Sequence, residues 1–255
     1  MYYVIHHVSV GKGDVYGISG TNHRCLHIST DVWYQSIMAA PVVLFSNFKG
    51  GCGKTALSFH LAHAATHLRV LTIDTDPQGD MYKRFPGVKF IGTDLDPSAQ
   101  GAVHEWRPFS WIMWNPLRWV DFDQSKFDLV IVDSGAKSEL VSGPRAPDVL
   151  VIPISGIDAA INSSEIAAAA LAGGVRRVVL VYNGLTLHAA GKRAMAGFGK
   201  DLPPGVVLLE TTIAEGRAAM EDTAVRKAPL WAFGSGKVAL TMYQACTELL
   251  HVVRI

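Results

Sequence analysis

Short apolar runs recur along the chain after residue 41, and segments of helix length separate several of them. The runs are continuous stretches of Val, Ile and Leu, which is typical of strands buried on both faces of a parallel sheet. We predict strands at 42–46, 69–73, 128–132, 148–153, 177–182 and 205–208. We predict helices at 54–67, 158–172, 187–198 and 237–252. This alternation predicts an α/β fold with a doubly wound, mostly parallel sheet and helices on both faces.

The first 37 residues differ from the rest of the chain. They carry several histidines and glycines and only short apolar stretches, and Met38 stands just ahead of the first strand that we predict. We therefore predict two parts, an N-terminal extension of unknown role at 1–37 and an α/β domain at 38–255. The histidines suggest metal ligands, but they lack the paired spacing that a metal site needs.

Composition limits the class of protein. Lys and Arg total 23 against 22 Asp and Glu, so a nucleic-acid surface would have to be a local patch. The three cysteines are widely spaced and suggest neither a disulfide framework nor a zinc site. No apolar stretch approaches the ~18 residues of a membrane span, and the N-terminus lacks a signal-peptide pattern. We expect a soluble, cytoplasmic protein with no membrane partner.

A glycine-rich loop joins the first predicted strand to the first predicted helix. Its sequence is Phe48-Lys49-Gly50-Gly51-Cys52-Gly53-Lys54-Thr55. Glycines let backbone N–H groups turn toward an anion, and a helix N-terminus adds partial positive charge. In a P-loop the lysine reaches the outer phosphates and the following hydroxyl binds Mg²⁺. The predicted phosphate-binding residues are Gly50, Gly51, Cys52, Gly53, Lys54, Thr55 and Ala56.

The loop departs from the ordinary P-loop pattern at two positions. The first glycine of the motif would fall on Phe48, and an extra lysine, Lys49, follows it.

Acidic residues stand where two other apolar runs end. Asp74 and Asp76 follow the run that ends at Ile73, and Asp133 ends the run from Leu129. Each motif alone is also a common turn former. Ligands of open α/β sheets sit outside the carboxyl ends of the strands, where both motifs would meet the loop. Together the three strand ends predict a metal–nucleotide site.

These motifs resemble the ParA/MinD family of P-loop NTPases. The segment from Lys49 to Thr55 is similar to the family's deviant Walker A motif, and residues 74–79 resemble its second motif almost letter for letter. The likeness continues through Asp133, the run at 148–153 and the run that ends on Asn183, and it extends over residues 41–250.

The resemblance implies a role for each matching residue. Lys49 would cross a dimer interface to the partner's nucleotide, so that two subunits sandwich two ATP molecules. Asp76 would position water and, with Lys49 and Lys54, form the catalytic set. Asp74 and Asp133, together with Thr55, would lie near the Mg²⁺, and Asn183 would contact adenine.

The family resemblance also implies partners and a task. It implies a slow, partner-stimulated ATPase that forms a homodimer with ATP and binds DNA without sequence preference. A centromere-binding or cargo adaptor protein would complete a DNA partition system. Basic residues for DNA are scattered over the C-terminal half, among them Arg176-Arg177, Lys192-Arg193, Arg217, Arg226-Lys227 and Lys237.

One departure keeps other functions open. The family follows the Asp133 position with Thr-Pro-Pro, whereas this chain has Ser134-Gly135-Ala136-Lys137-Ser138-Glu139-Leu140. A similar stretch occurs in ParA-like ATPases of conjugation and DNA-transfer systems. The alternatives are therefore an ATPase of such a system, a protein-positioning ATPase, and a nonhydrolytic nucleotide-gated interaction protein. An electron carrier of the same fold would need paired cysteines, which this spacing does not offer.

Two further segments carry aromatic or amphipathic patterns. Four tryptophans crowd one stretch and favour a cover packed over the sheet, with partner docking and base stacking as alternatives: Trp106, Trp111, Trp114 and Trp119. The last predicted helix is amphipathic with a weakly charged polar face, which favours packing on the sheet over membrane binding.

Overall fold

The computed structural model describes residues 4–10, 13–19, 40–47, 50–88, 90–91, 94–95, 97–116, 126–135, 146–184, 197, 202–234 and 236–253. The chain divides into two compact units, Met1–Ala39 and Ala40–Ile255. Within the first unit, β1 (Val4–Val10) and β2 (Gly13–Ser19) form an antiparallel hairpin. The assignment of residues 1–37 as an extension with a separate role stays a prediction.

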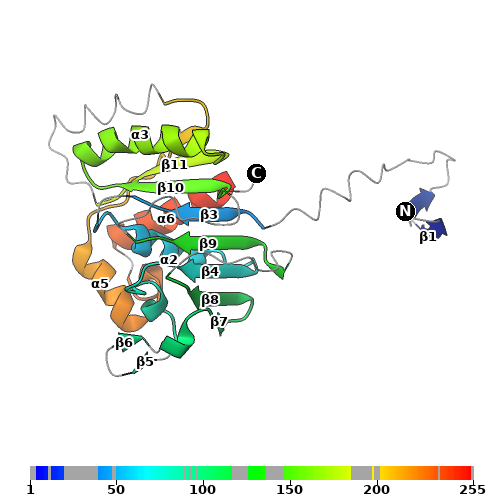
Figure 1. The fold of residues 1–255 in the computed structure, drawn as a ribbon, viewed down its shortest axis with the longest axis horizontal. Helices are drawn as coiled ribbons and strands as arrows, with labels where there is room; N and C mark the ends of the chain where they lie inside the picture. The colour runs from blue at the N-terminus through cyan, green and yellow to red at the C-terminus, as the bar shows by residue number, and fades with distance from the viewer. Residues whose placement is uncertain are drawn as a thin grey trace. The chain divides into compact units, whose positions relative to one another are not determined.

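The second unit is built on an eight-stranded sheet with the order β12-β11-β10-β3-β9-β4-β8-β7. Neighbouring strands are parallel except for the pair β7 and β8, which is antiparallel. Figure 1 shows the middle of this sheet, with β3 between β10 and β9. The mostly parallel sheet confirms the predicted fold class.

Six strands of the sheet lie where the apolar runs predict them, with ends that differ by at most one residue. They are β3 (Val42–Phe45), β4 (Val70–Asp74), β9 (Leu129–Asp133), β10 (Val149–Ile154), β11 (Arg177–Tyr182) and β12 (Val206–Leu208). Two very short strands, β5 (Phe90–Ile91) and β6 (Asp94–Leu95), form a separate antiparallel pair.

Three of the four predicted helices are present: α2 (Lys54–Ala64), α3 (Ile157–Ala172) and α6 (Lys237–Val253). The helix predicted at 187–198 lies outside the described residues, except for residue 197. The structure adds α5 (Arg217–Arg226), whose largely polar and alanine sequence has no apolar stripe to predict it. Three single turns complete the set, η1 (Tyr82–Arg84), η2 (Pro97–Ala99) and η4 (Leu230–Ala232).

Alternate residues of the central strands pack into two separate cores. Val43 and Phe45 of β3 face the core that holds the buried sides of α2 and α6. Val42 and Leu44 face the core on the opposite side, where α3 packs against β10 and β11. The strands are therefore buried on both faces, which is why their sequences are continuously apolar.

The apolar face of α6 packs against the core, as predicted. Met242, Cys246 and Leu249 of this helix are fully buried, and α6 lies against α2. Within the described part of the chain, no helix combines the length and apolarity needed to cross a bilayer.

The tryptophan-rich stretch is not a cover over the sheet, so that interpretation is wrong. It forms β7 (Val103–Arg107) and β8 (Ser110–Trp114), which extend the sheet at its edge beyond β4. Trp106 packs its ring against Phe85, with the ring centroids 4.7 Å apart, and the Arg107 guanidinium lies 4.4 Å from the Trp106 ring centroid. Trp119 lies outside the described residues.

Candidate functional site

The glycine loop leads from the end of β3 into the first turn of α2. Gly51 and Gly53 have φ values of 71° and 99°, in the left-handed region that glycine adopts without a steric penalty. Among the described residues, no side chain caps the N-terminus of α2. A helix N-terminus that follows such a loop can bind an anion through its first N–H groups. Phe48 and Lys49 lie outside the described residues, so the dimer role of Lys49 stays a prediction.

Lys54, the first residue of α2, is folded back over this loop. Its side chain is buried, and Nζ donates to the Asn47 carbonyl oxygen at 3.3 Å. The ammonium therefore lies beside the backbone of the glycine loop, where the sequence predicts a phosphate.

Asn183 lies directly after β11 and contacts the same loop. Its Nδ2 donates to the Cys52 carbonyl oxygen at 2.8 Å. A Cβ added at Gly53 would lie 1.8 Å from Asn183 Nδ2, so this contact requires glycine at position 53. The predicted contact between Asn183 and adenine stays a prediction.

Gly53→Ala is therefore expected to lower the free energy of unfolding by about 2–4 kcal/mol, because it combines left-handed backbone strain with a side-chain clash. The matched control is Gly51→Ala, which has a φ of 71° but no atom within 4 Å of the added Cβ. That variant should lose only about 1–2 kcal/mol. Urea unfolding of both measures the difference, and equal losses would contradict the close Asn183 contact.

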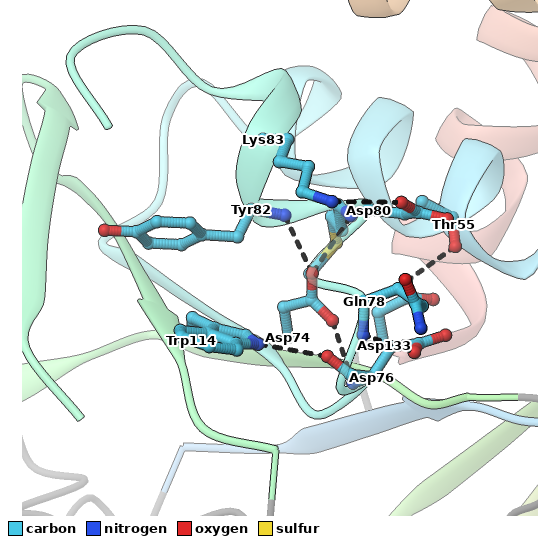
Figure 2. Close-up of polar contacts among 10 residues, drawn as sticks. Thr55, Asp74, Asp76, Gln78, Asp80, Tyr82, Lys83, Trp114 and Asp133 are labelled. Atoms are coloured by element: carbon cyan, nitrogen blue, oxygen red, sulfur yellow. Dashed lines mark hydrogen bonds and ion pairs between the residues drawn. The ribbon is translucent and has the colours of Figure 1, made fainter. Parts of the chain in front are cut away.

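Asp133 and Thr55 meet at the carboxyl end of β9. The Thr55 hydroxyl donates to Asp133 Oδ2 at 2.8 Å, as Figure 2 shows. The second oxygen, Asp133 Oδ1, is buried and has no hydrogen-bond partner among the described residues. Burial raises the pKa of Asp133 above its ordinary value, while the hydroxyls of Thr55 and Ser58 and the nearby Lys54 charge act against that rise.

These residues fit a magnesium ion. Mg²⁺ prefers oxygen ligands and typically takes one or two from the protein, with waters and substrate phosphates filling the rest. The Thr55 hydroxyl and the unpartnered Asp133 Oδ1 would hold it, directly or through water, and a bound cation would offset the cost of the buried carboxylate. The described residues contain no group of three His, Cys, Asp or Glu that could hold an ion unaided.

Asp74 shapes the turn that follows β4. Its Oδ1 accepts the Asp76 N–H at 3.0 Å, and its Oδ2 accepts the N–H groups of Met81 at 3.0 Å and Tyr82 at 2.8 Å. Burial, together with the nearby Asp133 charge, raises the pKa of Asp74 well above its ordinary value. Three backbone hydrogen bonds give Asp74 a clear structural role, and its role near the metal stays a prediction.

Asp76 lies in that turn and faces Gly135. Its Oδ1 accepts the Gln78 N–H at 2.9 Å, and its carbonyl oxygen accepts the Trp114 indole N–H at 3.0 Å. A Cβ added at Gly135 would lie 3.3 Å from Asp76 Oδ2, so the bare glycine allows the close approach. Figure 2 shows Asp76 and Asp133 close together, with Trp114 beside the Asp76 turn.

The structure thus brings most of the predicted site residues together at the carboxyl ends of the central strands. Lys54, Thr55, Asp74, Asp76 and Asp133 all come from the glycine loop or from the ends of β4 and β9, which are neighbours. The sequence did not identify the two residues that lie against Asp76 in space, namely Trp114 and Gly135. Only the Asp-Ser-Gly sequence after β9 offered a signal, because glycine there allows another group to come close.

Comparisons with known proteins agree with this geometry. A family model described as the CobQ/CobB/MinD/ParA nucleotide binding domain matches residues 43–215, which is more than half of the chain. A search of curated protein sequences finds no match.

Several solved structures share the fold. Apo McdA from Cyanothece is 18% identical with a TM-score of 0.57, over 83% of this chain and 99% of that chain. MinD from Pyrococcus horikoshii, complexed with Mg-ADP, is 14% identical with a TM-score of 0.60, over 84% and 98%. The pNOB8 ParA bound to nonspecific DNA is 17% identical with a TM-score of 0.51, over 84% and 98%.

At these identities the solved structures establish the fold, and the family model establishes the family. The model covers the glycine loop, the Asp74–Asp76 turn, Asp133 and Asn183, the same residues whose geometry is described above. The chain therefore belongs to the CobQ/CobB/MinD/ParA family of P-loop nucleotide-binding proteins.

Proposed function

We propose that this protein is a Mg²⁺-dependent ATPase that alternates between a monomer and an ATP-sandwich dimer and so partitions or positions DNA. The observation that carries the proposal is the pairing of Thr55 with Asp133 at 2.8 Å, next to the buried Lys54. The Asp76 turn lies at the same edge of the sheet. A nucleotide with its metal needs these groups in one place.

The chemistry follows from the character of each group. The N–H groups of the glycine loop and the Lys54 ammonium bind the phosphates and stabilise the charge that develops during phosphoryl transfer. Thr55 and Asp133 would hold Mg²⁺, which would supply positive charge to offset the negative charge of the phosphates. Asp76 orients the water that attacks the terminal phosphate, because hydrolysis requires that water in line with the leaving group.

The dimer and the DNA partner rest on the family and on the solved neighbours. Lys49 is the residue proposed to reach the partner's nucleotide. One structural neighbour, the pNOB8 ParA, is bound to nonspecific DNA, and this supports DNA as the proposed partner. Binding to DNA phosphates would be salt-dependent and independent of sequence.

ATP turnover tests the enzyme proposal. The wild-type protein should release phosphate slowly, and Asp76→Ala should reduce the rate about 100-fold while changing ATP affinity only a few-fold. Asp80→Ala is the matched control, because Asp80 lies in the same turn but is exposed and pairs with Lys83 at 3.8 Å. No turnover in the wild type would exclude the ATPase and leave a nucleotide-gated interaction protein.

Sizing the protein with ADP and with ATP, each with and without nonspecific DNA, tests the switch. We expect a dimer only with ATP, and DNA binding only by that dimer. Lys49→Ala should lose dimerisation and hydrolysis before it loses nucleotide binding. A monomer under all four conditions would contradict the proposed switch.

A further inference from the structure

Hydrogen bonds fix Asp76 on several sides. Its N–H donates to Asp74 Oδ1, its Oδ1 accepts the Gln78 N–H, and its carbonyl oxygen accepts the Gly79 N–H at 2.9 Å. These partners all lie within residues 74–79, at the end of β4 and in the turn that follows it. Among the described residues, the one hydrogen bond to Asp76 from outside the turn comes from the Trp114 indole N–H.

Trp114 reaches Asp76 from a fixed position in the sheet. It is the last residue of β8 and lies directly opposite Asp74 in the parallel pairing of β4 and β8. The next residue, Asn115, donates its N–H to the Asp74 carbonyl oxygen at 2.8 Å, so the pairing continues past the strand end. The Trp114 ring is half-buried and packs against the core on the α2 side. A strand-borne donor of this kind holds its partner more rigidly than a loop residue does.

The carboxylate of Asp76 is held on one oxygen. Oδ1 is occupied by the Gln78 N–H, whereas no described residue donates to Oδ2. Oδ2 lies beside Gly135, where an added Cβ would be 3.3 Å away. Oδ2 is therefore the oxygen left for a water, and its direction depends on the backbone of Asp76.

We propose that Trp114 is a positioning residue for Asp76. Its indole N–H fixes the Asp76 carbonyl and, through the Asp76 backbone, the direction in which Oδ2 meets the attacking water. The inference rests on the proposed function, in which Asp76 orients that water. In-line attack tolerates little misplacement, so one lost hydrogen bond at the backbone of Asp76 affects turnover.

The test is Trp114→Phe, which removes the N–H and keeps an aromatic ring in the core. We expect kcat to fall about fivefold to tenfold, as for the loss of one hydrogen bond, with the Kd for ATP changed less than about twofold. The matched control is Trp106→Phe, because the Trp106 indole nitrogen is buried without a partner among the described residues. That variant should keep the wild-type kcat.

A second substitution separates positioning from packing. Replacing Trp114 with 3-benzothienylalanine puts sulfur in place of the N–H in a ring of nearly the same shape, so it should lower kcat as Trp114→Phe does. A wild-type kcat in this variant overturns the proposal. A Kd for ATP that rises by as large a factor as kcat falls also overturns it, and so does a lower thermal stability with an unchanged kcat. Wild-type turnover is measured in parallel, so that failure of the ATPase proposal itself is distinguished from failure of this one.

Discussion

Lys54→Ala is expected to abolish nucleotide binding at micromolar concentrations. The Lys54 ammonium would make two or more charge-assisted hydrogen bonds to phosphate oxygens, each worth about 1.5–3 kcal/mol. Their loss weakens affinity by about 1000-fold. Titration with a fluorescent ATP analogue and Mg²⁺ measures the change directly.

The structure explains why this lysine cannot be replaced by another nearby cation. Lys54 is 6% exposed and is held against the Asn47 carbonyl at the start of α2, so its charge acts in a site from which water is largely excluded. Lys83 is the matched control: it lies on η1, is partly exposed and pairs with Asp80 at 3.8 Å. Lys83→Ala should bind nucleotide like the wild type. If Lys54→Ala retained wild-type affinity, the nucleotide site would not be the glycine loop.

The sequence predicts the central strands well, because a strand that is buried on both faces is apolar at almost every position. β3, β9 and β10 consist mostly of Val, Ile and Leu, and their ends differ from the predicted ones by at most one residue. Asp74 and Asp133 follow or end such strands, so topology alone could place them together at the carboxyl ends of the strands.

The outer strands β7 and β8 could not be predicted in the same way. β7 and β8 mix Trp, Arg, His and Glu with apolar residues, since an edge hairpin is buried on fewer sides. Their aromatic residues therefore suggested a cover. The Trp114–Asp76 hydrogen bond depends on the register between β4 and β8, which links residues far apart in the chain and has no local signature.

The different surroundings of the two carboxylates also needed the structure. Spacing along the chain does not show how the burial of Asp74 and Asp76 differs, yet Asp74 is fully buried and accepts three backbone hydrogen bonds, whereas Asp76 is only half-buried. The difference arises because the chain turns back over Asp74 into η1, bringing the N–H groups of Met81 and Tyr82 onto its carboxylate. Spacing alone does not reveal such a turn.

Two histidines of α2, the buried His60 and the half-buried His63, should make the fold acid-sensitive. His60 donates Nδ1–H to the Ala56 carbonyl oxygen and accepts the Leu230 N–H on Nε2, so both ring nitrogens are used by the neutral form. His63 lies among Phe59, Phe85 and Trp106, and its Nε2 is buried without a partner among the described residues. Burial lowers the pKa of His60 to about 4 and that of His63 to about 3, with the Arg107 charge also lowering the latter.

The direction of the pH effect follows from these values. Well above pH 6.5 neither the folded nor the unfolded chain protonates these histidines, so they cause no loss of stability there. As the pH falls below 6.5 the unfolded chain binds protons and the folded chain does not, so stability is lost toward the folded pKa values. At pH 5 the loss is about 2 kcal/mol for each histidine, or about 4 kcal/mol together. Asp74 and Asp133, whose pKa values are raised, oppose this loss, because the folded chain binds their protons more tightly.

A variant that removes one histidine isolates this effect from the opposing carboxylates. His63→Phe keeps an aromatic ring in the cluster of Phe59, Phe85 and Trp106 and deletes the unpartnered nitrogen, so it should be at least as stable as the wild type at pH 7.5. Between pH 7.5 and pH 5, urea unfolding should show that the wild type loses about 2 kcal/mol more than this variant. His251→Gln, at an exposed position of α6, is the control and should follow the wild-type pH dependence. Parallel pH dependences for His63→Phe and the wild type would mean that His63 is already protonated in the folded protein or is exposed to solvent.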